Sequence, residues 1–244
     1  MPTGKRTLLI FAIAFILTLI ITAPATLLNG LVQQATQGRL VLASSSGTVW
    51  QGSATPSLQL REGNFIALDR VHWQIAFLPL LGGKLKIKLF HDNAPQANAT
   101  EAILSPGDIE LNHALLSLPA AALSVVSPLL QPAQLQGRLN FESEHLVITP
   151  QGMTGVVRAD WLNAGSALSP INPLGKYQLT LTGAGENLQI ALATTNGPLH
   201  LDGRGTWSRA HGMEFRGTAR AAEGQQKRLA ALLIHLGPEE TKGV

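Results

Sequence analysis

The stretch Lys84-Leu85-Lys86-Ile87-Lys88-Leu89 alternates charged and apolar residues without interruption. Successive side chains of a β-strand point to opposite faces, so the apolar residues lie on one side and the lysines on the other. The stretch therefore predicts a half-buried strand. We interpret the lysine row as a solvated face or a protected edge rather than as a binding stripe.

Runs on both sides of this stretch repeat the alternation. Residues 71–77 place Trp73 and Ile75 on one face, and residues 177–182 begin a meander with turns at Gly183-Ala-Gly185 and Asn196-Gly197. We predict a mainly β fold of antiparallel sheets, with a short middle helix and a C-terminal helix. Residues 225–236 carry leucines at helical spacing and form that last helix.

Other segments have weaker patterns. Residues 44–46 are three serines and predict a turn, whereas residues 113–118 and 119–127 are candidates for helices. The helical candidates and the prolines after them would divide the β region into possible halves over residues 39–112 and 135–236.

The N-terminal part is apolar from Leu8 to Ala23, with no charged residue, and Lys5 and Arg6 stand just before it. We predict a cytoplasmic stub over residues 1–7, a transmembrane anchor over 8–28 that continues through Pro24, and a periplasmic β-rich domain over 29–244. A helix can bond the threonine hydroxyls of this run to its own carbonyls. The alternative is a cleaved signal peptide, because Ala23-Pro24-Ala25 has the small-x-small form of a cleavage site. Both interpretations export the rest of the chain.

Composition narrows the function classes. The chain has no cysteine, so it has no disulfide, thiolate metal site or cysteine nucleophile. Charged residues make up only 14% of it, below the ~25% of typical soluble proteins. A net charge of +3 without aromatic and basic residues interleaved is no signal for nucleic acid.

Residues able to do chemistry form no recognisable motif. Two Glu-x-x-His spacings occur, Glu110 with His113 and Glu142 with His145, but this spacing brings the side chains together only on a helix. No nucleophile elbow, phosphate loop or dinucleotide fingerprint is present. We assign no catalytic, cofactor-binding or metal-binding residue and no cofactor, and we expect that the protein is not an enzyme.

Several segments together resemble a known family. The similarity covers most of the exported region, although each piece alone is unspecific. The chain resembles protein N of the bacterial type II secretion system in these segments: Gly47-Thr-Val-Trp-Gln-Gly-Ser-Ala54, Trp73, Leu78-Pro-Leu-Leu-Gly-Gly-Lys-Leu85, Gly175-Lys-Tyr-Gln-Leu179, 196–207, 215–219 and 229–233. The resemblance implies a single-pass inner-membrane protein of Gram-negative bacteria that assists the export of folded proteins across the outer membrane.

Two functions follow from these observations. The leading hypothesis is a non-catalytic, inner-membrane-anchored accessory of type II secretion that contacts other secretion subunits, in the inner-membrane platform or at the secretin, through protein–protein contacts. The alternative is a periplasmic lipid-handling or envelope-bridging module with an open apolar β groove. The alternation is compatible with a closed barrel and with an open sheet, and we do not favour lipid as a partner.

Overall fold

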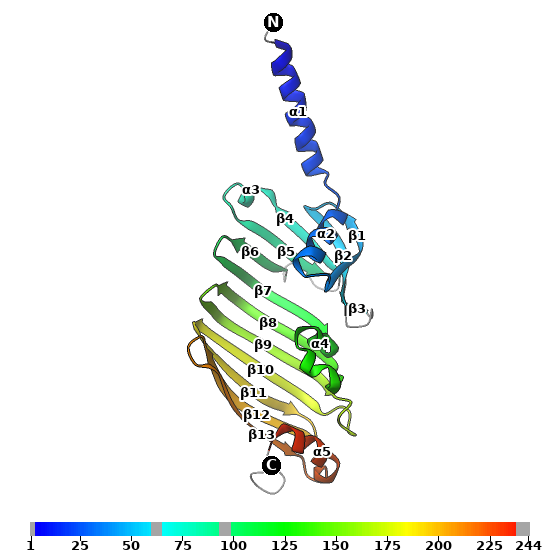
Figure 1. Cartoon of the computed structure of the whole chain (residues 1–244), viewed down its shortest axis with the longest axis vertical. Coiled ribbons are helices and arrows are strands. Elements are labelled where there is room, and N and C mark those ends of the chain that lie inside the picture. The colour runs from blue at the N-terminus through cyan, green and yellow to red at the C-terminus, as the bar shows by residue number, and fades with distance from the viewer. Residues whose placement is uncertain (1–2, 60–64, 93–98, 238–244) are drawn as a thin grey trace.

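A thirteen-stranded antiparallel sheet forms most of the molecule (Figure 1). The computed structural model describes residues 3–59, 65–92 and 99–237. The strands are β1 (Leu40–Gly47), β2 (Gln51–Gln59), β3 (Phe65–Ala67), β4 (Val71–Ala76), β5 (Leu85–His91), β6 (Thr100–Ser105), β7 (Asp108–Pro119), β8 (Gln136–Thr149), β9 (Gly152–Gly165), β10 (Gly175–Gly185), β11 (Asn187–Asn196), β12 (Leu199–Ser208) and β13 (Gly212–Ala221).

The sheet is open. From β4 onward each strand pairs with its neighbours in sequence, and β1 and β13 form the two ends of the series. Within the described residues these two end strands do not pair with each other, so the sheet is the open alternative and not a closed barrel. At about 4.8 Å between strands, the series extends for about 50 Å.

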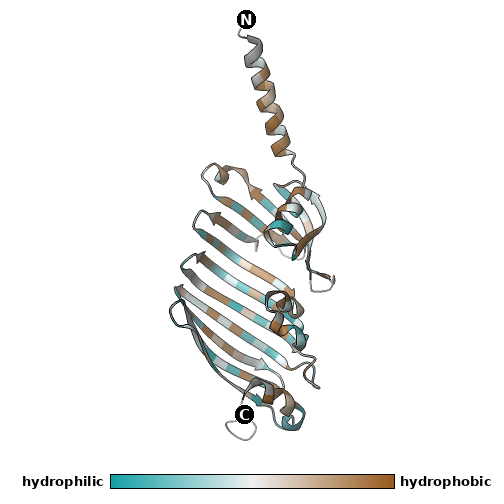
Figure 2. Ribbon diagram, in the orientation of Figure 1, coloured by the Kyte–Doolittle hydropathy of each residue, from teal (hydrophilic) through white to brown (hydrophobic). Residues whose placement is uncertain are grey.

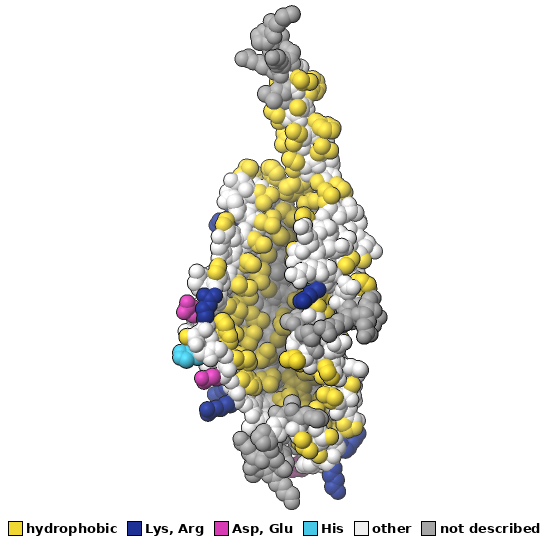
Figure 3. Space-filling model, in the orientation of Figure 1, with side chains coloured by type: hydrophobic (Ala, Val, Ile, Leu, Met, Phe, Trp, Pro, Cys, Tyr) yellow, Lys and Arg dark blue, Asp and Glu magenta, His cyan; other side chains and the backbone are white. Residues whose placement is uncertain are grey.

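The two faces of the sheet differ in polarity. The registers place Ile87 opposite Ala102, Leu116 opposite Phe141, and Leu179 opposite Leu192, all on one face. Each strand therefore shows alternating apolar and polar bands (Figure 2). The apolar face is the hollowed one in the space-filling view, and we call it the concave face (Figure 3).

The helices are α1 (Thr3–Ile21), α2 (Thr26–Ala35), α3 (Phe77–Leu80), α4 (Leu123–Val126) and α5 (Gln226–Leu236), with 3-10 turns η3 (Ala120–Ala122) and η4 (Pro128–Ala133). Two threonine hydroxyls donate to carbonyls of α1 as expected, Thr18 to Ala14 O at 2.9 Å and Thr22, the residue after the helix, to Thr18 O at 2.7 Å. Among the described residues, no helix combines the length and the apolar character that crossing a membrane requires.

Three expectations about local structure are wrong. The helix does not continue through Pro24, because residues 23–25 join the sheet: Ala25 N–H donates to Gly47 O and Val49 N–H donates to Ala23 O. Residues 44–46 lie inside β1, where the register shifts and Ser44 has a φ of 51°. Residues 113–118 belong to β7. The other helical candidate, 119–127, is confirmed over 120–126 as the short η3 and α4.

The core lies in two clusters near the ends of the sheet. Near β1, Ala25 packs with Ala54 and Trp73, and the Trp73 ring lies over Gly52, where an added Cβ would be 2.6 Å from the ring. At the other end, α5 places Leu229 and Leu232 against Leu199 and Tyr177. The predicted C-terminal helix and its buried leucines are thus confirmed.

Candidate functional site

An apolar trough runs across the strands between the two core clusters (Figure 3). In the described part of the chain, none of the paired strand residues on the concave face is Asp, Glu, Lys or Arg. The opposite, convex face carries the charges, including the pair Lys86–Glu101 at 2.8 Å. The trough is therefore a continuous low-polarity surface on one side of the sheet.

Much of the trough remains accessible to solvent. Leu116 is 49% exposed, Phe215 41% and Ile148 39%, although all three side chains are on the concave face. The helices α2, α4 and α5 lie along one side of the sheet (Figure 1). Large contiguous apolar patches are unusual on monomeric proteins and mark contact or ligand surfaces.

Polar atoms on this face bond within the protein. Ser143 Oγ donates to Val156 O at 2.7 Å, and Thr100 Oγ1 donates to His113 O at 3.0 Å. Tyr177 Oη lies 3.1 Å from Leu174 O and 2.9 Å from Leu199 O, and burial raises the pKa of this phenol above its usual value. The donor hydrogens of these hydroxyls are therefore used within the protein and are not offered to an occupant of the trough.

One end of the trough lies beside α1. The Trp50 indole N–H donates to Ile20 O at 2.7 Å, and the ring meets Phe77 edge-to-face at 5.3 Å between centroids. Beyond Phe77, Leu78 and Leu81 are about three-quarters exposed. Together Trp50, Phe77, Leu78 and Leu81 form an apolar rim between α1 and the strands β4 and β5.

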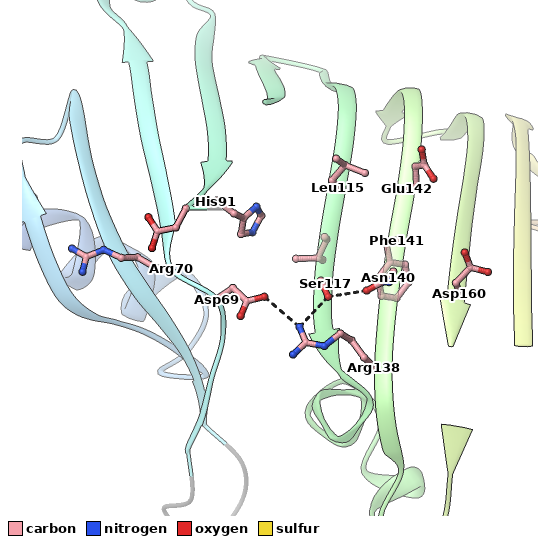
Figure 4. Close-up of a pocket in the computed structure, with 12 residues that line it drawn as sticks. Asp69, Arg70, His91, Leu115, Ser117, Arg138, Asn140, Phe141, Glu142 and Asp160 are labelled. Atoms are coloured by element: carbon pink, nitrogen blue, oxygen red, sulfur yellow. Dashed lines mark hydrogen bonds and ion pairs between the residues drawn. The ribbon is translucent and has the colours of Figure 1, made fainter. Parts of the chain in front are cut away.

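A second hollow lies at the edge of β7, where β6 ends. It measures about 680 Å³ and is lined by polar side chains together with Leu115, Leu116 and Phe141, so it meets the trough at Leu116. Figure 4 shows Arg138 pointing toward Asp69, with 3.3 Å between Nη1 and Oδ2, and Arg138 also donates to Ser117 Oγ at 3.2 Å. Ser117 Oγ donates in turn to Asn140 Oδ1 at 2.8 Å. Both charged partners are more than half exposed, so this pair joins the β3–β4 connection to β8 only weakly.

The family assignment agrees with the resemblance seen in the sequence. Residues 38–244 match the family model of type II secretion system (T2SS) protein N. The chain belongs to this family. No curated protein and no solved structure matches the chain. The protein N family is a structural component of secretion and not an enzyme, and it places the chain in the cell envelope.

The acid–histidine spacings of this protein N chain lie in the strands β7 and β8 and not on a helix, so they do not bring their side chains together, as expected. His145 lies 3.8 Å from Glu110 of the neighbouring strand and bonds to Asn112 at 2.7 Å, rather than pairing with Glu142. His113 is in a bulge with a φ of 51°. No group of three or more His, Asp or Glu residues suited to a metal occurs among the residues described.

The sequence offered an open apolar groove only as the alternative, because the residues of the trough look like ordinary core positions. Each strand supplies only a few alternating apolar residues, which equally fit a closed core. The one available signal was the number of such strands compared with the few helices able to cover them.

Proposed function

We propose that this protein N chain is a non-catalytic accessory of type II secretion, anchored in the inner membrane by its N-terminal helix, with its sheet in the periplasm. The family match over residues 38–244 is the observation that carries the role in secretion. We further propose that the chain acts through contacts with other subunits of the secretion apparatus.

The exposed surface of α1 supports the anchor. Its 19 residues include leucine, isoleucine and phenylalanine side chains that are 41–72% exposed. The basic residues Lys5 and Arg6 lie at its start, and none follows before Arg39. Under the positive-inside rule this asymmetry puts the N-terminus in the cytoplasm.

The edge strand β13 is the contact surface that we favour. Its residues from Gly212 to Gly217 are all exposed, and its one pairing partner in the described sheet is β12. An exposed edge strand offers unpaired backbone groups to an added strand, which gives affinity without a sequence motif. We expect a secretion subunit to pair along this edge.

A secretion assay tests the role. A strain lacking the chain should release less of a type II substrate into the medium, and the intact chain should restore release. A photoreactive residue in place of Arg216 on β13 should yield an adduct with another secretion subunit, identified by mass spectrometry. The same residue in place of Arg204 on β12 is the control, because Arg204 pairs with Arg216 on the convex face but lies one strand inside. Equal adducts at both positions would refute strand addition at β13.

Reporter fusions test the topology. A reporter that fluoresces only in the cytoplasm, inserted at the Pro106–Gly107 turn between β6 and β7, should be dark. A bright fusion would contradict the orientation. Mature protein that begins at Thr26 would show that the N-terminal run is cleaved, although Ala25 is buried against the sheet.

A second candidate function is supported by the exposed trough. A lipid-handling or envelope-bridging module needs an apolar surface that reaches from a membrane into the periplasm. The concave face, with its uncharged lining and accessible side chains such as Leu116, has this character.

A further inference from the structure

The trough is suited to an occupant that needs no hydrogen bonds. The backbone groups of the central strands bond within the sheet, and the polar side chains Ser143, Thr100 and Tyr177 bond to the protein's own carbonyls. An extended peptide lying on this face would bury N–H and C=O groups without partners, which is costly. A hydrocarbon chain has no such groups.

The lining also disfavours a charged occupant. None of the described, paired concave residues is acidic or basic, whereas the convex face holds ion pairs such as Lys86–Glu101. An ionised group buried in the trough would lose its hydration without gaining an opposite charge. The charged part of any ligand must therefore stay at the rim while its apolar part lies inside.

The rim connects the trough to the helix that enters the membrane in the proposed function. Trp50 bonds to the last turn of α1 and contacts Phe77, and the exposed Leu78 and Leu81 continue this surface beside β4 and β5. An apolar chain leaving the bilayer beside α1 thus meets apolar side chains until it reaches the concave face. This continuity points to a membrane lipid as the source of the chain.

We propose that the trough binds the acyl chains of a glycerophospholipid, taken up at the rim beside α1. One leaflet contributes about 15 Å to a hydrocarbon core of about 30 Å. The whole strand series extends for about 50 Å, and the part between the two core clusters leaves room for acyl chains along the trough beyond the rim. This inference rests on the proposed anchor for the position of the rim, and on the concave face for the binding itself.

Site-specific photocrosslinking in the full chain tests the proposal in cells. A benzophenone amino acid replaces Leu116 or Ile148 on the concave face, or Val156 on the convex face. Ile148 and Val156 form a matched pair, because they are 39% and 38% exposed on adjacent strands. Cells are grown with radioactive phosphate and irradiated, and the adducts of the purified chain are identified by mass spectrometry.

We expect about tenfold more glycerophospholipid adduct at Leu116 and Ile148 than at Val156, because only the concave positions contact acyl chains. Equal labelling of the two faces would overturn the proposal. A lipopolysaccharide adduct at the concave positions would also overturn the proposal, as would a protein adduct in place of lipid, whether to another protein or to a second copy of the chain. The absence of any adduct at both concave positions would overturn it too.

The outcomes separate this inference from the proposed function. The crosslinks at Leu116 and Ile148 report whether lipid lies on the concave face. The reporter fusion at the Pro106–Gly107 turn reports the compartment of the sheet, and the crosslink at Arg216 reports the protein partner. Lipid adducts with a bright fusion would refute the anchor topology alone. Adducts with a secretion subunit at Arg216, without lipid at Leu116 or Ile148, would refute only the trough proposal.

Discussion

Replacing Leu229 by alanine should lower the free energy of unfolding by about 3 kcal/mol. The Leu229 side chain is fully buried between α5 and the sheet, in the cluster that includes Leu199 and Tyr177. The substitution removes buried methyl groups and leaves a cavity, and such changes cost about 2–5 kcal/mol. An isolated helix as short as α5, with 11 residues, is marginal in water, so the contacts of its leucines hold it in place.

Ile234→Ala on the same helix is the matched control, because Ile234 is 75% exposed and alanine favours helix. Urea unfolding followed by tryptophan fluorescence, to which Trp161 contributes from beside Tyr177 with 5.9 Å between ring centroids, measures both variants. The thermal midpoint of the Leu229 variant should fall by about 6–12 °C, and that of the Ile234 variant should hardly move. A loss below about 1 kcal/mol for Leu229→Ala, or equal losses for both, would refute the docking of α5 on the sheet.

Three further predictions concern other parts of the chain. Ile87→Asp places a charge against the Trp73 cluster and should lower the free energy of unfolding by about 3 kcal/mol. Lys84→Asp, at an exposed position, should change this free energy little. Equal losses in urea unfolding would contradict the assignment of the two faces. Tyr177 is the one tyrosine of the chain, and its raised pKa means that only the unfolded state ionises as the pH passes about 10. The free energy of unfolding should therefore fall above that pH. In Tyr177→Phe, measured over a series of alkaline pH values, this fall should be shallower, although the substitution removes the hydroxyl that bonds to Leu174 O and Leu199 O. Replacing Ser143 by alanine leaves Val156 O without its donor and should cost about 1 kcal/mol, measured by urea unfolding; a larger loss than for Leu229→Ala would be unexpected.

Local alternation predicted most strands correctly, and the exceptions have physical causes. The stretch 85–89 is a strand with Leu85, Ile87 and Leu89 on the concave side, as expected. Residues 113–118 look helical because two adjacent leucines, Leu115 and Leu116, break the alternation. In the structure Leu115 borders the hollow at the edge of β7, where an apolar side chain on the convex side is tolerated.

Whether the apolar faces of the strands close on one another could not be predicted from the pattern. Alternation fixes which residues of one strand share a face, but the curvature of the whole sheet depends on twist and bulges summed over many strands. The positive φ angles of Ser44 and His113 occur at two such irregularities, and neither residue type marks them. The trough follows from this curvature, so it was visible only in three dimensions.

The pairing of β4 to β13 in chain order has a consequence for how such proteins can change in evolution. Each strand from β5 to β12 depends for its backbone partners on its immediate predecessor and successor. Inserting or deleting one hairpin would leave every other pairing in place and change the sheet by about 10 Å. The span of the protein can therefore be adjusted in hairpin-sized increments, with the two helix-covered ends retained as caps.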